Sequence, residues 1–149
     1  DIEGSWLRCE AAEILGDESL IRRTREEAVR MADAVYGTAI DEDGAIMYEG
    51  EHGKITDGNK SWWPQAENVI GMFNAWQISG EEKFLEASMR TWEFIRDHVI
   101  DREHGEWHAN IRRDGTVEPG RLVSFWKCPY HNSRMVLEMK ERMNKSIRR

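Results

Sequence analysis

The chain has 149 residues, of which 33% are charged and 40% are hydrophobic, and its formal net charge is −7. This acidic balance argues against nucleic acid or an anionic membrane as a partner, because both require a basic face. The sequence contains no long apolar run and no recognisable signal peptide, and its two cysteines, Cys9 and Cys128, lie far apart. We therefore expect a reduced, cytoplasmic protein with no membrane partner.

Two helices and a polar excursion open the chain. A helical stripe of apolar residues precedes Gly16, which is suited to end a helix, and Asp17 is suited to begin the next one. The first stripe consists of Leu7, Ala11, Ile14 and Leu15, and the second of Leu20, Thr24, Ala28, Met31 and Val35. The glycine-containing stretch 41–60 then predicts turns and short strands.

The rest of the chain repeats this order. Residues 64–79 are apolar almost all round, which is typical of a helix that is buried on most sides. The next helix carries an apolar stripe opposite a charged face and is expected on the outside; the stripe is Leu85, Ser88, Trp92, Ile95 and Val99. A second excursion, 101–123, and a fifth helix, about 129–143, complete the pattern. Inner helices that alternate with outer ones predict an all-α fold of the α/α toroid type.

Three residues recur at one spacing. Glu3, Glu67 and His131 each lie close to tryptophans near the start of an expected inner helix, 64 positions apart (67 − 3 and 131 − 67). Repeated supersecondary units stack, so equivalent positions lie along one rim. The three side chains are therefore candidates for one shared site. The alternative for each glutamate is helix capping, since an acidic residue in the first turn is favoured by the helix dipole alone.

Three motifs resemble those of a known family. Trp-Trp-Pro-Gln-Ala-Glu at 62–67, Glu-His-Gly-Glu-Trp at 103–107 and Trp-Lys-Cys-Pro-Tyr-His-Asn at 126–132 are similar to the C-terminal half of the N-acylglucosamine 2-epimerase superfamily. The resemblance is strongest to its cellobiose 2-epimerase and mannobiose 2-epimerase branch and extends over residues 1–149. It implies the last five helices of a single (α/α)6 barrel domain, in a protein that interconverts glucose and mannose configuration at C2 of a reducing-end sugar without a cofactor.

The resemblance also implies roles for individual residues. His131 matches one catalytic histidine, and the second belongs to a His-Asp-Ile-Glu-like motif of which this chain begins at Asp1-Ile2-Glu3. That second histidine would directly precede Asp1, and Glu3 would be its motif partner. Trp63 and Trp126 match aromatic residues that contact the sugar, and Glu67 matches a polar residue of the pocket. With seven helices and one histidine absent, the chain alone is expected to be inactive.

Elementary chemistry favours the same residue types. The C2 proton of a sugar becomes acidic after ring opening, and a base with a pKa near the working pH, such as histidine, can remove it. Inversion needs a second acid/base on the opposite face, and a donor must stabilise the enediolate oxygen. Lys127 and His131 are the candidates for that donor, although Lys127 can equally be solvated.

Other tryptophans and histidines are expected to have ordinary roles. Trp6, Trp76 and Trp92 are assigned to packing between helices. The segment His104-Gly105-Glu106-Trp107-His108 looks like a zinc motif, but its glutamate is misplaced for H-E-x-x-H and it lies in an expected hairpin. We therefore predict no metal site.

Several alternatives remain open at the level of sequence. Glu3 and Glu67 are also compatible with the two carboxylates of a glycoside hydrolase, which α/α toroids can host. An aldose–ketose isomerase of the same superfamily would use the same proton transfer, and a non-catalytic sugar-binding fragment is a further possibility. The uncovered inner-helix surface predicts either self-association or a separate N-terminal half that covers it. The partner in all enzymatic cases is a mono- or disaccharide.

Overall fold

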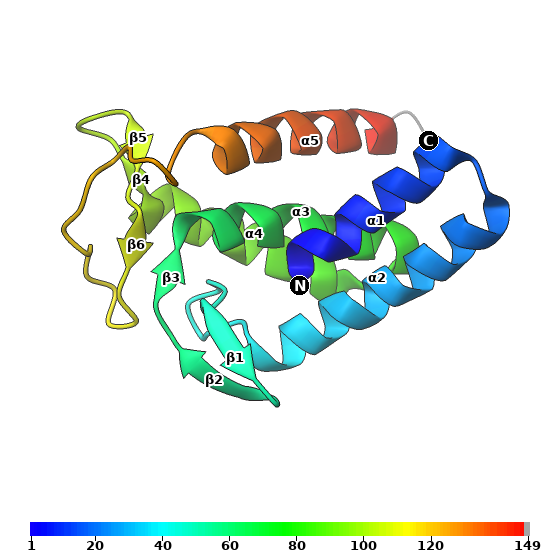
Figure 1. Cartoon of the computed structure of the whole chain (residues 1–149), viewed down its shortest axis with the longest axis horizontal. Helices are drawn as coiled ribbons and strands as arrows, with labels where there is room; N and C mark the ends of the chain where they lie inside the picture. Colours follow the sequence, from blue (N-terminus) through cyan, green and yellow to red (C-terminus); the bar gives the residue numbers. More distant parts are fainter. Residues whose placement is uncertain (148–149) are drawn as a thin grey trace.

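The computed structural model describes residues 1–147, with helices forming two layers and short strands gathered at one end (Figure 1). The helices are α1 (Ile2–Leu15), α2 (Glu18–Thr38), α3 (Trp62–Ser79), α4 (Glu82–Phe94), which continues into a π-helical turn at Ile95–Val99, and α5 (Tyr130–Ile147). Strands β1 (Glu49–Glu51) and β2 (Lys54–Asp57) form a hairpin, β3 (Lys60–Ser61) pairs with β6 (Asn110–Ile111), and β4 (Ile100–Asp101) pairs with β5 (Glu106–Trp107), all antiparallel. Among the described residues, no helix is long and apolar enough to cross a membrane.

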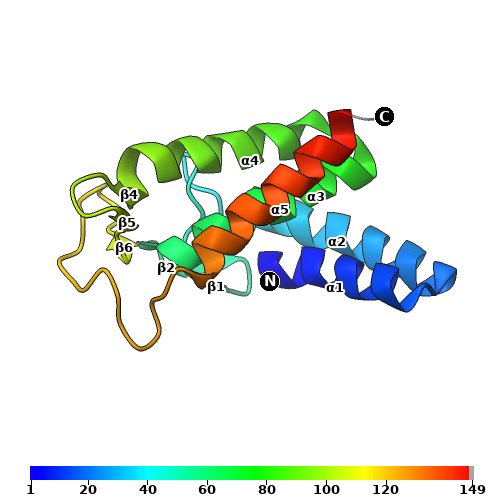
Figure 2. The ribbon, with the colours of Figure 1, turned by 90° about the horizontal axis from the view of Figure 1, so that it is seen from above.

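Helices α1, α3 and α5 form the inner layer, and α2 and α4 run back along the outside toward the strands (Figures 1 and 2). The predicted alternation of inner and outer helices is thus confirmed. The predicted boundaries differ at the ends, since α3 begins two residues earlier than 64 and α5 continues to Ile147. Long excursions join α2 to α3 and α4 to α5, so these two inner helices begin near the strands. The start of α1 lines a cavity together with residues of β1 and β2.

The local sequence explains where the helices end. Gly16 and Gly80, which occupy equivalent repeat positions, adopt φ values of 72° and 74° and stop α1 and α3 in the left-handed conformation that glycine adopts without strain. The Asp17 side chain accepts hydrogen bonds from the backbone N–H groups of Ser19 and Leu20 and so caps α2. These signals place a tight turn between each inner helix and its outer partner.

The inner helix α3 is the centre of the molecule. Its residues from Pro64 to Ala75 are all buried, as the apolar sequence of 64–79 predicted. A Cβ atom at Gly71 would lie 2.5 Å from Cγ1 of Ile2, so this glycine allows α1 to approach α3 closely beside Glu3. Gln65 holds the first excursion on α3, since its side chain donates to the carbonyl of Ile46 and accepts from the Ile46 N–H.

The apolar stripe that the sequence predicted to be the packed face of α1 is exposed, so that prediction is wrong. The stripe of Leu7, Ala11, Ile14 and Leu15 is exposed, and the buried residues of α1 are instead Ile2, Ser5, Trp6, Cys9 and Ala12. Helices α2 and α3 cover that second face, while the side carrying Ile14 and Leu15 has no covering element among residues 1–147. Trp92 also departs from its predicted packing role, because it is 40% exposed.

Candidate active site

The three residues spaced by 64 positions meet in space. One side-chain atom each of Glu3, Glu67 and His131 lies within 4.8 Å of the other two. Glu3 and His131 lie in the first turns of α1 and α5, and Glu67 lies in the second turn of α3. Since all three inner helices begin at the same end of the molecule, the repeat brings these positions together.

Glu67 is the buried centre of this cluster. Its side chain has no exposed surface, and both of its oxygens contact protein groups. Oε1 lies 2.7 Å from Nδ1 of His131 and 2.6 Å from Nη2 of Arg134, and Oε2 accepts a hydrogen bond of 3.0 Å from the indole N–H of Trp6. Glu67, expected from the resemblance to be a polar residue of the pocket, is therefore buried, with both oxygens bonded to protein groups.

The Glu67 contact decides which nitrogen of His131 is available. Nδ1 lies 2.7 Å from the carboxylate but 3.5 Å from the guanidinium of Arg134, so the shorter contact assigns the Nδ1 proton to a hydrogen bond with Glu67. Nε2 is then the free basic nitrogen of the neutral ring. The His131 side chain is 22% exposed, so the ring is partly accessible while its orienting carboxylate is not.

Arg134 is the residue that sequence reasoning missed. Its Nη2 donates to Oε1 of Glu3 as well as to Glu67, and its guanidinium lies over the rings of Trp6 and Tyr130. Burial acts to lower the pKa of Arg134, but the hydrogen bonds to Glu67 and Glu3 outweigh it and hold that pKa above its ordinary value. A signal was present in the sequence, because Arg134 follows His131 by three residues and therefore lies on the same face of α5.

Arg134 also bears on metal binding. Two carboxylates and a histidine at this spacing are the ligand types of many divalent cations. Here the guanidinium of Arg134 bonds both carboxylates and supplies the positive charge at their meeting point. A metal cation placed between Glu3 and Glu67 would be repelled by the positive charge of that guanidinium.

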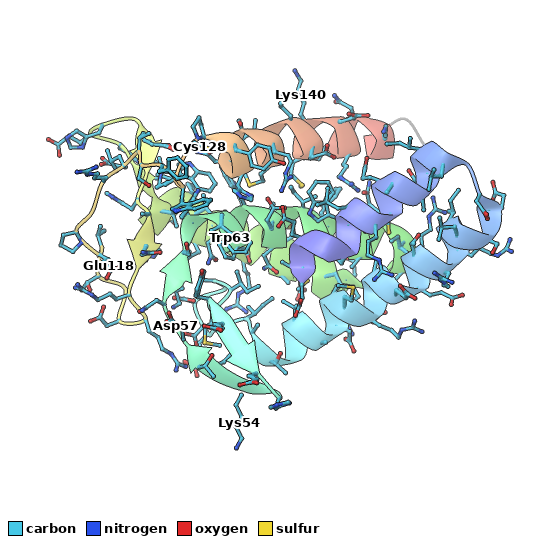
Figure 3. The ribbon with its side chains drawn as sticks, in the orientation of Figure 1. Lys54, Asp57, Trp63, Glu118, Cys128 and Lys140 are labelled. Carbon is cyan, nitrogen blue, oxygen red and sulfur yellow. The ribbon has the colours of Figure 1, made fainter. Side chains whose placement is uncertain are left out.

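The predicted aromatic residues occupy different environments. Trp63, at the start of α3 (Figure 3), packs against His131 with ring centroids 5.5 Å apart and meets Tyr48 edge-on. It also borders a cavity of about 400 Å³ that is lined by Glu3 and by residues of α2 and the β1–β2 hairpin. Trp126 is 83% exposed in the segment before α5, where it pairs edge-on with Phe125.

Two further assignments change. Trp6, which was assigned to packing alone, is buried and also donates its indole N–H to Glu67. Lys127, a candidate donor for the enediolate, is buried and directs its ammonium group to Glu106 and to the carbonyl of Leu122. Neither role could be read from the sequence, because each depends on a residue distant in the chain.

Comparison with known proteins shows which family this chain is similar to. Residues 1–131 match the model of the N-acylglucosamine 2-epimerase (GlcNAc 2-epimerase) family. The chain is 43% identical over 141 residues to a cellobiose 2-epimerase from Ruminococcus albus and 42% identical over 142 residues to one from Bacteroides fragilis; in each case the match covers 93% of this chain and 36% of the relative. A D-mannose isomerase from Marinomonas mediterranea is 23% identical over 107 residues.

Solved structures agree with these relatives. The crystal structure of a sugar epimerase from a ruminal bacterium superposes with a TM-score of 0.89 at 38% identity, covering 95% of this chain and 36% of that one. The structure of cellobiose 2-epimerase from Bacillus thermoamylovorans gives a TM-score of 0.84 at 37% identity, with the same coverage. The chain spans about a third of the length of these relatives, so its five helices are part of the (α/α)6 barrel predicted from the sequence. The chain belongs to the N-acylglucosamine 2-epimerase family.

Proposed function

We propose that the natural protein containing this chain is a sugar 2-epimerase that acts on the reducing-end glucose or mannose unit of a β-linked disaccharide. The observation that carries this proposal is the 2.7 Å contact between Nδ1 of His131 and the fully buried Oε1 of Glu67, beneath the partly exposed ring of Trp63. A histidine whose Nδ1 is held by a buried carboxylate and whose ring is partly exposed is suited to abstract a proton. The cellobiose 2-epimerases among the relatives support the substrate class.

His131 would remove the C2 proton of the open-chain sugar through Nε2. Glu67 would hold the ring in that tautomer and stabilise the imidazolium that forms, while Arg134 bonds both Glu67 and Glu3 and holds them in place. Return of a proton to the opposite face of the planar enediolate inverts C2. That step requires a second acid/base, which the family resemblance assigns to a second histidine with Glu3 as its motif partner.

Two aromatic residues would bind the substrate. The Trp63 ring lies beside His131 and borders the cavity, so it can pack on the C–H face of the sugar that reacts. Trp126 is exposed on the segment that leads into α5 and is suited to contact the second sugar ring. No cofactor has a step in this mechanism, since proton transfer between carbon and imidazole needs none.

The burial of Glu67 argues against the glycoside hydrolase alternative. A glycosidase needs two carboxyl groups that reach the glycosidic oxygen and the anomeric carbon. Glu67 is fully buried, and Trp6, His131 and Arg134 engage its oxygens, so it cannot reach either atom. An aldose–ketose isomerase remains the nearest alternative, because it would use the same base; the D-mannose isomerase relative is consistent with it.

The test is incubation of the natural protein with cellobiose in deuterated water, followed by NMR. Epimerisation should place deuterium at C2 and yield the mannose-configured disaccharide, and His131→Asn should reduce both by roughly 10²–10⁴-fold. His98→Asn, on the outer layer, is the matched control and should retain activity. A ketose product would support the isomerase, and release of free glucose would support a hydrolase. The 149-residue chain alone is expected to show no turnover.

A further inference from the structure

The segment that carries Trp126 is irregular, and it has one buried side chain at its end. Residues 118–129 contain neither helix nor strand, and Val123, Phe125 and Trp126 are 61%, 90% and 83% exposed. Lys127, the next residue, is only 2% exposed. A lysine that is buried directly beside an exposed tryptophan needs a specific partner, because an unpaired buried ammonium is costly.

Glu106 is that partner. Oε1 of Glu106 lies 3.3 Å from Nζ of Lys127, and the same ammonium donates to the carbonyl of Leu122 at 2.7 Å. The Lys127 ammonium also lies 5.5 Å from the centre of the Trp62 ring. The side chains of Lys127 and Glu106 are 3% and 16% exposed, so this pair is shielded from water and ties the irregular segment to strand β5.

The same carboxylate also holds the start of α5. Nδ2 of Asn132 lies 3.1 Å from Oε1 and 3.4 Å from Oε2 of Glu106, and Oε2 accepts a further bond from the backbone N–H of Trp107. Asn132 is the immediate neighbour of His131, and Lys127 is the immediate neighbour of Trp126. One carboxylate thus bonds the residues adjacent to two members of the proposed site.

We propose that Glu106 is a positioning residue that fixes Trp126 through Lys127 and His131 through Asn132. This inference rests on the proposed function of the site. Replacement of buried ion pairs by apolar side chains is often neutral for stability, so fixing a geometry is a sufficient reason for a pair here. We call the contact with Lys127 the loop arm and the contact with Asn132 the helix arm. The two arms are separable, because each depends on its own donor side chain, which can be replaced by itself.

Three variants of the natural protein separate the arms. Lys127→Met removes only the loop arm, Asn132→Ala removes only the helix arm, and Glu106→Ala removes both. Glu118→Gln is the matched control, because Glu118 makes a similar bond to Asn110 within the same excursion and takes no part in the contacts of Glu106 with Lys127 and Asn132.

The measurements are KM and kcat for cellobiose. Lys127→Met should raise KM by roughly tenfold, the factor expected for one lost charge-assisted hydrogen bond, with kcat nearly unchanged. Asn132→Ala should instead lower kcat by roughly tenfold, because a small misplacement of a catalytic group is costly. Glu106→Ala should show both effects, and Glu118→Gln neither. Equal losses in both parameters for all three variants, or an unchanged KM in Lys127→Met, would overturn the proposal.

Hydrogen exchange of the peptides spanning 118–129 provides a readout independent of turnover. Exchange should accelerate in Lys127→Met and Glu106→Ala, and stay at the wild-type rate in Asn132→Ala and Glu118→Gln, with thermal unfolding midpoints measured for each variant. Unchanged exchange in Lys127→Met and Glu106→Ala would refute the anchor even if the natural protein turns over no sugar. Absence of turnover in the wild type with the predicted exchange pattern would refute the proposed function and leave the anchor supported.

Discussion

His131 donates through Nδ1 to a carboxylate, that of Glu67, which lies 64 residues earlier and has no exposed surface. The contact length of 2.7 Å and the burial of the acceptor make it the strongest structural constraint on the imidazole. A histidine held in this way presents one defined nitrogen, Nε2, to the partly open side of the site.

Replacement of Glu67 by glutamine tests this constraint directly. The amide would keep the size of the side chain but lose the charge that stabilises the imidazolium. We expect kcat of the natural protein to fall by roughly 10²–10⁴-fold with a small change in KM. Trp6→Phe, which removes the bond to Oε2 and leaves the contacts of Oε1 with His131 and Arg134, is the milder comparison. A Glu67→Gln variant with wild-type kcat would show that the pair has no part in proton transfer.

Arg134→Met should lower kcat. The raised pKa of Arg134 means that its charge is present at every working pH, and without it Glu3 and Glu67 would face each other with no cation between them. Mutual repulsion would displace Glu67 and, with it, the imidazole that Glu67 orients. We expect kcat of the natural protein to fall by roughly 10²-fold, because a small misplacement of a catalytic group is costly. A wild-type kcat in Arg134→Met would contradict this role.

The two tryptophans should differ in their effects. Trp63 contacts both His131 and Tyr48, so Trp63→Ala should raise KM and also lower kcat, through loss of support for the imidazole. Trp126→Ala should mainly raise KM for a disaccharide and leave KM for a free hexose nearly unchanged. Steady-state kinetics with both sugars distinguish these patterns, and Trp63→Phe should restore part of the loss.

Asp41 makes stability depend on pH. Burial acts to raise its pKa, but bonds from the Glu42 N–H, Lys60 and Arg113 outweigh this, and the pKa lies below its usual value. A depressed carboxyl pKa contributes stability above the unfolded value of about 3.9, and this is lost as the pH falls through the folded pKa. Asp41→Asn should therefore lower the thermal midpoint at pH 7, with a difference that shrinks below about pH 4. Glu42→Gln is the exposed control.

The chain by itself should self-associate. A groove of about 510 Å³ between α3, α4 and α5 is lined mainly by apolar residues, among them Phe73, Met89, Trp92 and Met139. Exposed apolar surface of this extent favours association. Light scattering of the purified 149-residue chain should give a mass above that of the monomer, and Met89→Lys with Val136→Lys should reduce it. A monodisperse wild-type monomer would contradict this expectation.

The sequence alone determined the helical order, the 64-residue repeat and the family. These properties are local or periodic, since Gly16, Gly80 and Asp17 mark helix ends through backbone conformation and capping, which neighbouring residues decide. The repeat also predicted that Glu3, Glu67 and His131 share a site, because equivalent positions in stacked units lie on one rim.

The tertiary structure decided which groups touch. Whether Glu67 faces a sugar or a histidine depends on how closely α1, α3 and α5 approach, and Gly71 against Ile2 sets part of that distance. The same packing brought Arg134 between two carboxylates and left the Ile14 face of α1 exposed although its periodicity suits a core. Periodicity identifies an apolar face, but only the arrangement of neighbouring helices determines whether that face is covered.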